Sequence, residues 1–422
     1  MDLATARQLT SPAGRALLEA LPPYDESRTL ALSEGLRERG VDPGLAAAAL
    51  TQTRLRDKAR AKLGPFADGM LFTPEGLEQA TRLVVAARHA QRYLAAGVTR
   101  VADLTCGLGA DALAFAGVGL RVLATDLDPA TAALAAHNLR AFPEAEVRCA
   151  DGLALDLPAE GVDGVYADPM RRTRTGTRVL DPAAYAPSLD AVWSLRDVVP
   201  ALGIKVGPGI AHAGLPDDAE TQWVSVDGDV VEAALWFGPL APDGPGRTAL
   251  VLRSTADGRL AARELRGPAP DSASGDHLVA DVGPVGAYLY EPDGAVIRAG
   301  LVAQVAAGLG GRLLDPTIAY VTSDAGPEAA SSGADVPLAT AYRVLDVMPF
   351  GLKRLKAYLR ENGVGRVTIK KRGTAVTPEQ LRRDLGLRNT PDSSEATLVL
   401  TRVAGRQSVL VVEPEPRAQT GA

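Results

Sequence analysis

The stretch that decides the fold is TRVADLTCGLG, residues 99–109. Its apolar first half is typical of a buried strand, which we expect to stop at Asp103. Gly107 and Gly109 then permit a tight backbone turn lined by bare amides, and a helix can begin at Ala110. A strand, a glycine turn and a helix in this order predict the first βαβ unit of a nucleotide-binding α/β sheet.

Three later strand-like runs also end at an aspartate. They are residues 121–125 before Asp126, residues 147–150 before Asp151, and residues 162–167 before Asp168. Asp126 comes 19 residues after Gly107, which fits the length of one βαβ unit. Ligands of doubly wound sheets bind beyond the carboxyl ends of the strands. We therefore expect these carboxylates, with Asp103, at one edge of one sheet.

The four carboxylates match the polar groups of S-adenosylmethionine. Asp103 is well placed for the methionine end, Asp126 can accept hydrogen bonds from both ribose hydroxyls, and Asp151 can bind the adenine amine. Asp168 is then expected to face the reacting methyl group. The turn completes the predicted cofactor site with Thr105, Gly107 and Gly109. This pattern predicts a methyltransferase that uses S-adenosylmethionine.

Two other interpretations compete with this one. The run GLGADA, residues 107–112, also satisfies the dinucleotide pattern of nicotinamide and flavin enzymes. In those enzymes the strand normally stays apolar up to its first glycine, whereas Asp103 stands four residues before Gly107. An isolated aspartate at a strand end most often caps a helix or a turn. Three aspartates in register make that ordinary role a weaker explanation than a ligand site.

Length and composition predict a soluble globular protein of several domains. The 422 residues exceed one ordinary core, so about two to four domains are expected. No apolar run reaches the roughly 18 residues of a membrane span. The N-terminus has neither a basic segment nor a signal core, which favours the cytoplasm. Two cysteines and four scattered histidines predict neither disulfides nor a metal site, and the sequence predicts no particular oligomeric state.

The chain divides into five predicted segments. They are an N-terminal helical cap (1–98), a cofactor-binding α/β domain (99–245), a β-rich connector with a helix near 295–309 (246–335), a basic α/β domain (336–415) and a tail (416–422). The last helix of the cap is expected over residues 74–94, so that Phe72, Thr73 and Gln79 could touch the ligand. Asp227-Gly228, between two apolar runs, predicts an antiparallel hairpin that closes the sheet.

The basic domain carries the opposite charge to the rest of the chain. Residues 341–412 hold 14 Lys and Arg against six Asp and Glu, although the net charge of the whole chain is −6. Their pattern of strand, helix, strand, helix, strand and strand predicts a compact α/β layer. A basic ridge that meets phosphates is expected from Lys353, Arg354, Lys356, Arg360, Lys370, Lys371 and Arg372. The alternative is a solvated basic helix face.

Seven motifs spread over most of the chain resemble a known family. They are LFTPEGLEQAT (71–81), DLTCGLG (103–109), DPMRR (168–172), WVS (223–225), YLYEPDGAVIRA (288–299), MPFGLK (348–353) and VTIKKRG (367–373). Together they are similar to the bacterial class I methyltransferases that carry a C-terminal THUMP-like domain. The resemblance implies a Rossmann-like class I methyltransferase sheet, mostly parallel with a terminal antiparallel hairpin, after an N-terminal helical cap. It also implies a THUMP-like, ferredoxin-like α/β domain, similar to modules that present RNA to modification enzymes.

The run Asp168-Pro169-Met170-Arg171-Arg172 bears on the methyl acceptor. Amino methyltransferases commonly place a second proline and an aromatic residue where this chain has Met170 and Arg171, which argues against an exocyclic amine. Methylation of pyrimidine C5 needs a cysteine nucleophile, and no cysteine follows Cys149. A ring nitrogen or a ribose oxygen is left, with Asp168 orienting or deprotonating it. Arg171 and Arg172 would hold guanine or a phosphate, unless they pair with nearby aspartates as a structural clamp.

The sequence therefore predicts an S-adenosylmethionine-dependent methyltransferase of structured RNA, tRNA or rRNA, with Asp168, Arg171 and Arg172 as catalytic residues. Lys205, at the end of the fifth strand, is a further candidate contact to the substrate. One alternative is a methyltransferase of a protein or a small molecule. Another is a non-catalytic RNA-binding protein that senses S-adenosylmethionine, although the intact aspartates argue against lost catalysis.

Overall fold

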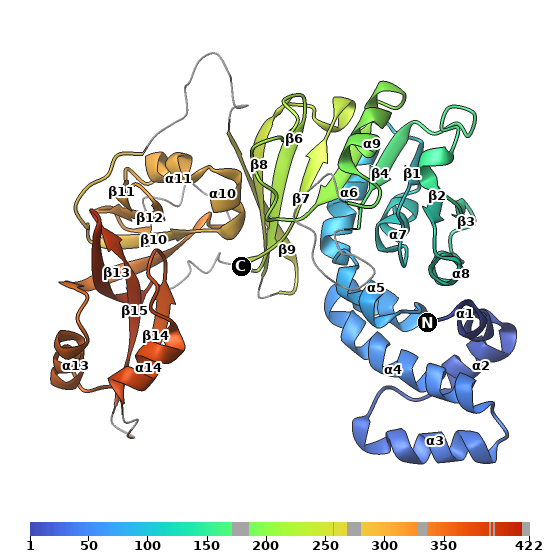
Figure 1. Cartoon of the computed structure of the whole chain (residues 1–422), viewed down its shortest axis with the longest axis horizontal. Helices are drawn as coiled ribbons and strands as arrows, with labels where there is room; N and C mark the ends of the chain where they lie inside the picture. Colours follow the sequence, from blue (N-terminus) through green and yellow to red (C-terminus); the bar gives the residue numbers. More distant parts are fainter. Residues whose placement is uncertain are drawn as a thin grey trace. The chain divides into compact units, whose positions relative to one another are not determined.

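The computed structural model describes residues 1–170, 185–255, 257–267, 280–327, 336–387, 390 and 393–415. The chain forms two compact units. Unit 1 consists of Met1–Glu220 and Ala233–Pro245, and unit 2 consists of Thr221–Glu232 and Gly246–Ala422. Figure 1 labels their helices and strands.

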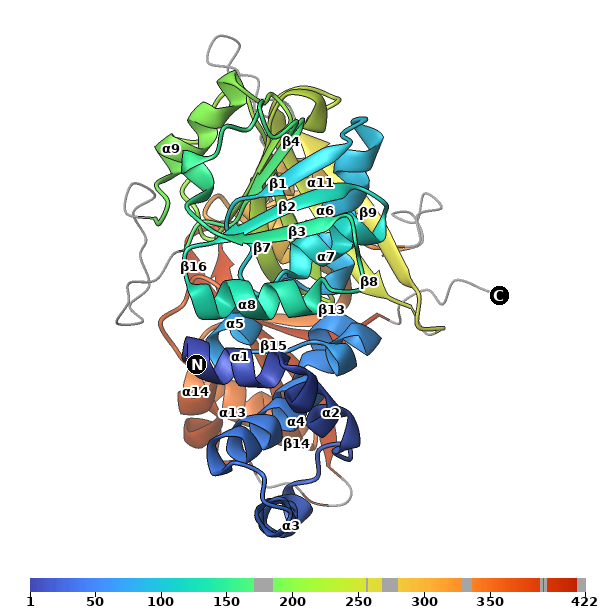
Figure 2. The same cartoon turned by 90° about the vertical axis from the view of Figure 1, so that its right-hand side faces the viewer.

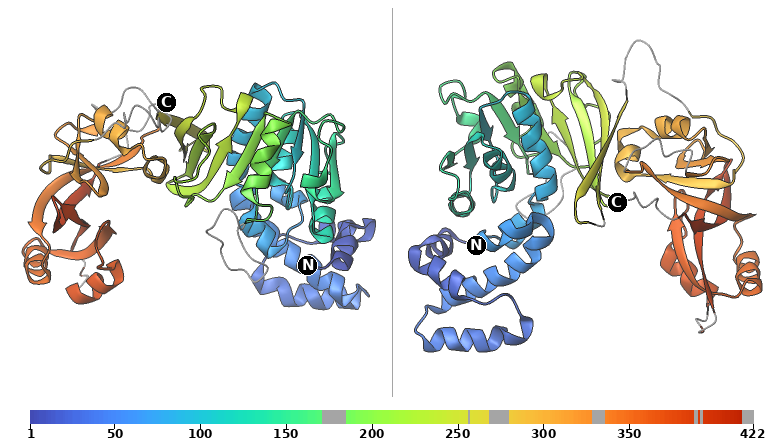
Figure 3. Two further views of the ribbon diagram at one scale, coloured as in Figure 1. Left: turned by 45° about the horizontal axis from the view of Figure 1, so that its top comes forward. Right: turned by 180° about the vertical axis from the view of Figure 1, so that it is seen from behind.

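The N-terminal part of unit 1 is helical, as predicted. Its helices are α1 (Leu3–Thr10), α2 (Pro12–Ala20), α3 (Thr29–Glu38), α4 (Pro43–Leu63), α5 (Pro74–Gln79) and α6 (Leu83–Ala95). Asp2, Ser11 and Asp42 cap α1, α2 and α4 by accepting a hydrogen bond from a first-turn amide. Helices α1, α2 and α3 pack against the long helix α4, and Figure 3 shows this part of the chain in blue.

The single helix predicted over residues 74–94 is wrong, because the chain breaks between α5 and α6. Ala80 and Arg82 have extended backbone conformations there. Lys62 of α4 donates hydrogen bonds to three carbonyls at the end of α5, and the Thr81 side chain binds Asp111 in the interior. These tertiary contacts outweigh the helical periodicity of the sequence.

Unit 1 also contains most of the predicted doubly wound sheet. Its strands are β1 (Arg100–Asp103), β2 (Arg121–Asp126), β3 (Ala145–Cys149), β4 (Gly164–Ala167), β5 (Leu202–Val206) and the second half of β7 (Asp229–Trp236), in the order β3-β2-β1-β4-β5-β7. All neighbours are parallel except β5 and β7, which pair antiparallel as predicted. The strand order reverses between β1 and β4, where doubly wound sheets bind ligands.

Helices α7 (Ala110–Gly117), α8 (Pro129–Asn138) and α9 (Leu189–Trp193) pack on this sheet. Figure 2 shows α8 alongside β3, with α1 next to α8. Aromatic rings fill the core, and Tyr93 packs edge-on against Phe115 and Trp236. Gly203 of β5 lies so close to these rings that an added Cβ would approach both Trp236 and Tyr93 to 2.5 Å.

In unit 2, β6 (Glu220–Val226) and β7 form the predicted hairpin. Its turn residues Asp227 and Gly228 have φ values of 52° and 99°, which two-residue hairpin turns require. The hairpin does not close the sheet as predicted, because the strand order continues as β7-β6-β8-β9, with β8 (Gly246–Ser254) and β9 (Leu260–Gly267) antiparallel. The helix expected near 295–309 is two helices, α10 (Gly294–Ala299) and α11 (Val302–Gly308), because the chain turns at Gly300 with φ 76°.

A second sheet holds the basic part of the chain. Its order is β11-β12-β10-β13-β16-β15-β14. The strands are β10 (Tyr288–Pro292), β11 (Arg312–Asp315), β12 (Ile318–Ser323), β13 (Ala339–Pro349), β14 (Val364–Lys371), β15 (Ser394–Val403) and β16 (Arg406–Pro414). Helices α13 (Leu352–Glu361) and α14 (Pro378–Leu385) pack through their leucines on one face. Because β10 pairs with β13, this sheet contains strands from both sides of residue 335. The domain boundary expected at residue 335 stays a prediction.

The ferredoxin-like detail of the prediction is wrong. A ferredoxin-like domain has the order β-α-β-β-α-β, whereas β13 to β16 with their helices follow β-α-β-α-β-β. The strands β14 and β15 are parallel neighbours joined through α14. The strands β15 and β16 form a tight hairpin, since Ala404 and Gly405 have φ values of 47° and 80°, and this turn has no room for a helix.

An extended segment between α4 and α5 is fixed by two buried polar side chains. The Gln52 amide donates to the Phe72 carbonyl and accepts from the Phe72 amide, both at 2.8 Å. The Asn138 amide accepts from the Leu71 amide at 2.7 Å and donates to the carbonyls of Leu71 and Leu108. Residues 70–73, which we call the strap, are therefore tied both to α4 and to the glycine turn.

We expect Gln52→Leu to lower the free energy of unfolding of unit 1 by about 2–5 kcal/mol, because it leaves two buried backbone groups of Phe72 without a partner. Chemical denaturation followed by circular dichroism measures this loss. Arg54→Leu, an exposed position of the same helix, is the control. Equal stability of the two variants would contradict the role given to the Gln52 hydrogen bonds.

Candidate active site

Two of the predicted aspartates lie side by side where the strand order reverses. Asp103 ends β1, and Asp168 follows β4, whose Tyr166 is the register partner of Asp103. Asp103 is only 1% exposed, and burial together with the nearby carboxylates of Asp111, Asp168 and Asp126 raises its pKa well above the usual value. A buried carboxylate in this position is stabilised by a cation. The site therefore fits the cationic cofactor predicted from the sequence.

The glycine turn has the predicted geometry. Gly107 and Gly109 have φ values of 54° and 83°, in the left-handed region that glycine tolerates. The Gly107 amide donates to Asp126 Oδ2 at 3.2 Å, which ties the turn to the end of β2. Burial raises the pKa of Asp126, although hydrogen bonds from the amides of Asp128 and Gly107 oppose the shift. The Thr105 hydroxyl accepts from the Asp168 amide at 2.7 Å and so connects the turn to the end of β4.

The remaining predicted cofactor residues have structural roles of their own. Asp151 is exposed and caps a short 3₁₀ turn by accepting from the Leu153 amide at 3.0 Å. Phe72 is fully buried, and Thr73 caps α5 by accepting from the Gly76 amide at 3.0 Å. Gln79 is exposed at the end of α5. None of these contacts tests the cofactor roles predicted for Asp151, Phe72 and Thr73.

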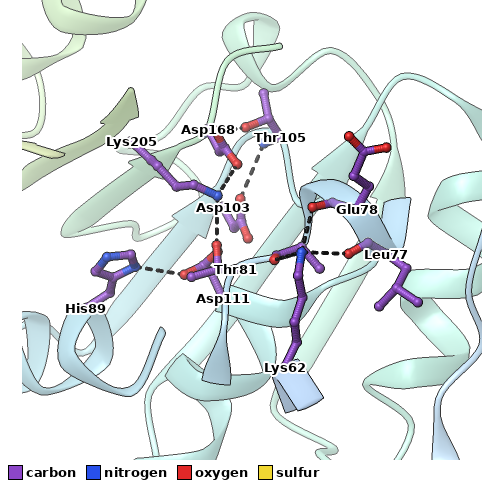
Figure 4. A network of polar contacts seen from close by, with 11 residues as sticks. Lys62, Leu77, Glu78, Thr81, His89, Asp103, Thr105, Asp111, Asp168 and Lys205 are labelled. Atoms are coloured by element: carbon purple, nitrogen blue, oxygen red, sulfur yellow. Dashed lines mark hydrogen bonds and ion pairs between the residues drawn. The ribbon is translucent and has the colours of Figure 1, made fainter. Parts of the chain in front are cut away.

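A chain of polar contacts runs inward from Asp168, as Figure 4 shows. Lys205 Nζ lies 2.7 Å from Asp168 Oδ2 and donates to Thr81 Oγ1 at 2.9 Å. The Thr81 hydroxyl in turn donates to Asp111 Oδ2 at 2.6 Å. At the far end, His89 Nδ1 lies 2.8 Å from Asp111 Oδ1. The five side chains belong to five different segments of unit 1.

This network compensates the buried carboxylate of Asp111 and the partly buried carboxylate of Asp168. Burial alone would raise the pKa of Asp111, but the hydrogen bond from His89 and the charges of His89 and Lys205 hold it below the usual value. Lys205 is itself only 6% exposed. Lys205 forms an ion pair with the Asp168 carboxylate, and its contact to the substrate stays a prediction. The Asp168 side chain is 28% exposed, so it is the member of the network that an acceptor can reach.

The sequence did not reveal three members of this network: Thr81, His89 and Asp111. Thr81 was hidden inside the predicted helix, and His89 is one of four scattered histidines. Asp111 carried a signal, because it is the one charged residue of the otherwise apolar helix α7. The predicted catalytic residues Arg171 and Arg172 lie outside the described residues.

The basic ridge is divided between the two faces of its sheet. Lys353, Arg354, Lys356 and Arg360 are exposed on α13, and Lys371 is exposed on the same face of β14 as the helix. Lys370 points to the opposite face, pairs with Glu291 at 2.6 Å and lies over the Tyr342 ring. Arg372 lies over the Tyr320 ring. Lys370 and Arg372 therefore do not share a face with Lys371, because alternate residues of a strand face opposite ways. The phosphate contacts of the ridge stay a prediction.

The described ranges contain neither a candidate membrane span nor a candidate metal site. No helix in that part of the chain is long and apolar enough to cross a membrane. Nor do the described side chains include a group of three or more His, Cys, Asp or Glu arranged to hold a metal ion.

Three family models match separate parts of the chain. A methyltransferase domain matches residues 102–170, which include the glycine turn and Asp168. A THUMP-like domain matches residues 339–414, from β13 to β16. A domain of unknown function matches residues 2–59, which cover most of the N-terminal helices.

Relatives cover nearly the whole length of the chain. Two strains of Mycobacterium tuberculosis have proteins named as uncharacterized S-adenosylmethionine-dependent methyltransferases, each 35% identical over 362 residues, which are 83% of this chain and 91% of the relative. The crystal structure of a protein from Porphyromonas gingivalis W83, named as a methyltransferase candidate, shares the fold with a TM-score of 0.70 and 22% identity, over 94% of this chain and all of that one. The predicted cofactor is confirmed, and the chain belongs to the family of S-adenosylmethionine-dependent methyltransferases, in a branch that carries a THUMP-like domain.

Proposed function

We propose that the protein methylates structured RNA, either tRNA or rRNA, at a ring nitrogen or a ribose oxygen, in the cytoplasm. The observation that carries the proposal is the Asp168–Lys205 ion pair at the end of β4, beside Asp103. The match to a THUMP-like domain supports RNA as the substrate, since this domain is similar to modules that present RNA to modification enzymes. The exposed basic residues of α13 support it independently, because they can meet several phosphates.

Asp168 is the proposed catalytic residue. S-adenosylmethionine supplies an electrophilic methyl group whose leaving group is already good, so the protein mainly has to align the acceptor and let it lose a proton. The Lys205 ammonium favours the ionised form of Asp168. An ionised carboxylate can accept a hydrogen bond from the N–H or O–H group that is to be methylated. Lys205 therefore acts in this proposal by holding Asp168. Arg171 and Arg172 stay proposed contacts to the nucleic acid.

The proposed cofactor contacts follow the ends of the strands. Asp103 would bind the cationic methionine end, and the amides of the turn from Thr105 to Gly109 would face the ligand. Asp126 would bind the ribose hydroxyls and Asp151 the adenine amine, and Phe72 and Thr73 are the further proposed contacts to the cofactor. The phosphate contacts proposed for RNA are Lys353, Arg354 and Lys371. Lys370 and Arg372 were predicted with them but point to the other face of the sheet, so they are not part of this surface.

We expect Asp168→Ala to lower methyl transfer about 100- to 10,000-fold, because the acceptor loses the group that orients or deprotonates it. The measurement uses radiolabelled S-adenosylmethionine and total RNA from a strain that lacks the gene, followed by digestion of the RNA to nucleosides. Cofactor affinity, measured by calorimetry, should be retained. Cofactor binding without any transfer from the wild-type protein to RNA would contradict the proposed substrate and point to a protein, a small molecule or a sensing role.

We expect the affinity for S-adenosylmethionine to fall in acid. The pKa of Asp103 is raised in the free protein, and a cation binds its ionised form, so affinity is full above this pKa and drops about tenfold per pH unit below it. Calorimetric titrations between about pH 8 and pH 5 measure the effect. Asp103→Asn should weaken binding and flatten the pH dependence, whereas the exposed Asp57→Asn should not. A flat profile for the wild-type protein would argue against Asp103 as the cation contact.

We expect the double variant Lys353→Ala/Arg354→Ala to bind RNA more weakly and with a smaller salt dependence. Each phosphate contact that is lost lowers the slope of log affinity against log salt concentration by about 0.7–0.9, so two contacts account for roughly 1.5. Fluorescence anisotropy with labelled RNA at several salt concentrations measures the slope. Arg37→Ala/Arg39→Ala, at exposed positions at the C-terminal end of α3, is the matched change of charge. An equal slope for both double variants would mean that α13 carries only a solvated face.

A further inference from the structure

The long helix α4 contacts the strap and the end of α5 with three polar side chains. Gln52 holds Phe72 as described above, and Arg56 Nε donates to the Met70 carbonyl at 2.9 Å. One helical turn and a half further on, Lys62 reaches the end of α5. The helix belongs to the N-terminal part of the chain, most of which matches only a domain of unknown function. All of these contacts lie within unit 1.

Lys62 fixes the place where α5 ends. Its ammonium donates to the carbonyls of Leu77 at 2.9 Å, Glu78 at 2.6 Å and Ala80 at 3.2 Å. An ammonium has three N–H donors, and a helix leaves its last carbonyls without intrahelical partners, so the two sets match. Burial and the nearby charges of Lys205 and Arg82 lower the pKa of Lys62. The charge of Lys62 is therefore felt at Lys205.

The residue that follows these carbonyls enters the network of Asp168. Ala80 turns the chain with an extended conformation, and the Thr81 side chain becomes 6% exposed. Its hydroxyl donates to Asp111 and accepts from Lys205, which pairs with Asp168 (Figure 4). The contact with Lys205 thus fixes the position of Asp168, and the contact with Thr81 fixes the position of Lys205. Thr81 is in turn positioned by the turn that Lys62 holds.

We propose that Lys62 is a positioning residue for methyl transfer, and that the N-terminal helical part of the chain is for this reason a component of the active site. Lys62 holds the turn Leu77–Thr81, so that Thr81 and Lys205 keep the Asp168 carboxylate in place for the acceptor. The inference rests on the proposed role of Asp168. It gives α4 a role in positioning the Asp168 carboxylate. The sequence does not reveal this role, because Lys62 contacts backbone carbonyls and not particular side chains.

The same helix offers variants that separate positioning from folding. Leu55, Ala59 and Leu63 bury the apolar face of α4, so removing the Lys62 ammonium leaves the packing of the helix intact. Lys62→Met keeps the unbranched stem and removes the charge. Lys62→Arg keeps charge and donors. Lys58→Met makes the same change of charge at an exposed position of α4 and is the matched control.

The test follows the network without needing to know the acceptor. The chain has seven lysines, so the reactivity of each toward an amine-specific acylating reagent is resolved by mass spectrometry. Lys205 is buried and should react slowly in the wild-type protein and in Lys58→Met. In Lys62→Met we expect it to react about tenfold faster, because the turn that carries Thr81 opens locally more often. Lys62→Arg should restore most of the protection. Equal reactivity of Lys205 in Lys62→Met and Lys58→Met would overturn the proposal.

Kinetics provide the second arm. We expect the kcat of Lys62→Met on total RNA from the deletion strain to fall on the order of 10- to 100-fold, as small misplacements of a catalytic group do, while the Kd for S-adenosylmethionine changes less than about threefold. A parallel loss of kcat, cofactor affinity and thermal stability would show a general folding defect and overturn the proposal. If the wild-type protein transfers no methyl group to RNA, the proposed function fails, and the reactivity of Lys205 alone decides whether Lys62 positions the network.

Discussion

The constraint on which this active site depends is the crowding of carboxylates at one edge of a parallel sheet. The carboxylates of Asp111, Asp126 and Asp168 lie near Asp103, and together with burial they raise its pKa. A buried charge is costly unless it is paired and hydrogen-bonded. The fold pairs Asp111 with His89 and Thr81, and it pairs Asp168 with Lys205. Asp103, whose side chain accepts a backbone hydrogen bond from Thr105, is the carboxylate that we propose a cationic cofactor compensates.

Compensation needs side chains that do not lie near the aspartates in the sequence. Lys205 comes from β5, Thr81 from the break between α5 and α6, and His89 from α6. The break exists only because Lys62 satisfies the carbonyls at the end of α5 and because the strap is tied down by Gln52 and Asn138. Side chains of the N-terminal helix α4 thus hold the backbone of the strap and of the end of α5 by hydrogen bonds. Such bonds fix the conformation of these segments whatever side chains the segments carry.

These origins explain which features the sequence could predict. The strand ends, the glycine turn, the hairpin at Asp227-Gly228 and the strands and helices from β13 to β16 depend on local periodicity and turn chemistry, and the structure has them. The helix break at Thr81 depends on contacts with residues 19 and 30 positions away, so its helical periodicity was misleading. The divided basic ridge was predictable in principle, because Lys370 and Lys371 are consecutive in a strand and must face opposite ways.

The distribution of charge gives the two parts of the chain different tasks in the proposed reaction. A site rich in carboxylates repels a polyanion, so its affinity for RNA has to come from elsewhere in the chain. The residues 341–412, with 14 basic against six acidic side chains, can supply it through phosphates. Phosphate contacts carry no sequence information. In the proposed reaction, selection of the methylated atom therefore falls to the groups around Asp168. A carboxylate in a fixed position discriminates among methyl acceptors by geometry. The Asp168 carboxylate is accordingly held by a buried network and not by solvent-exposed side chains.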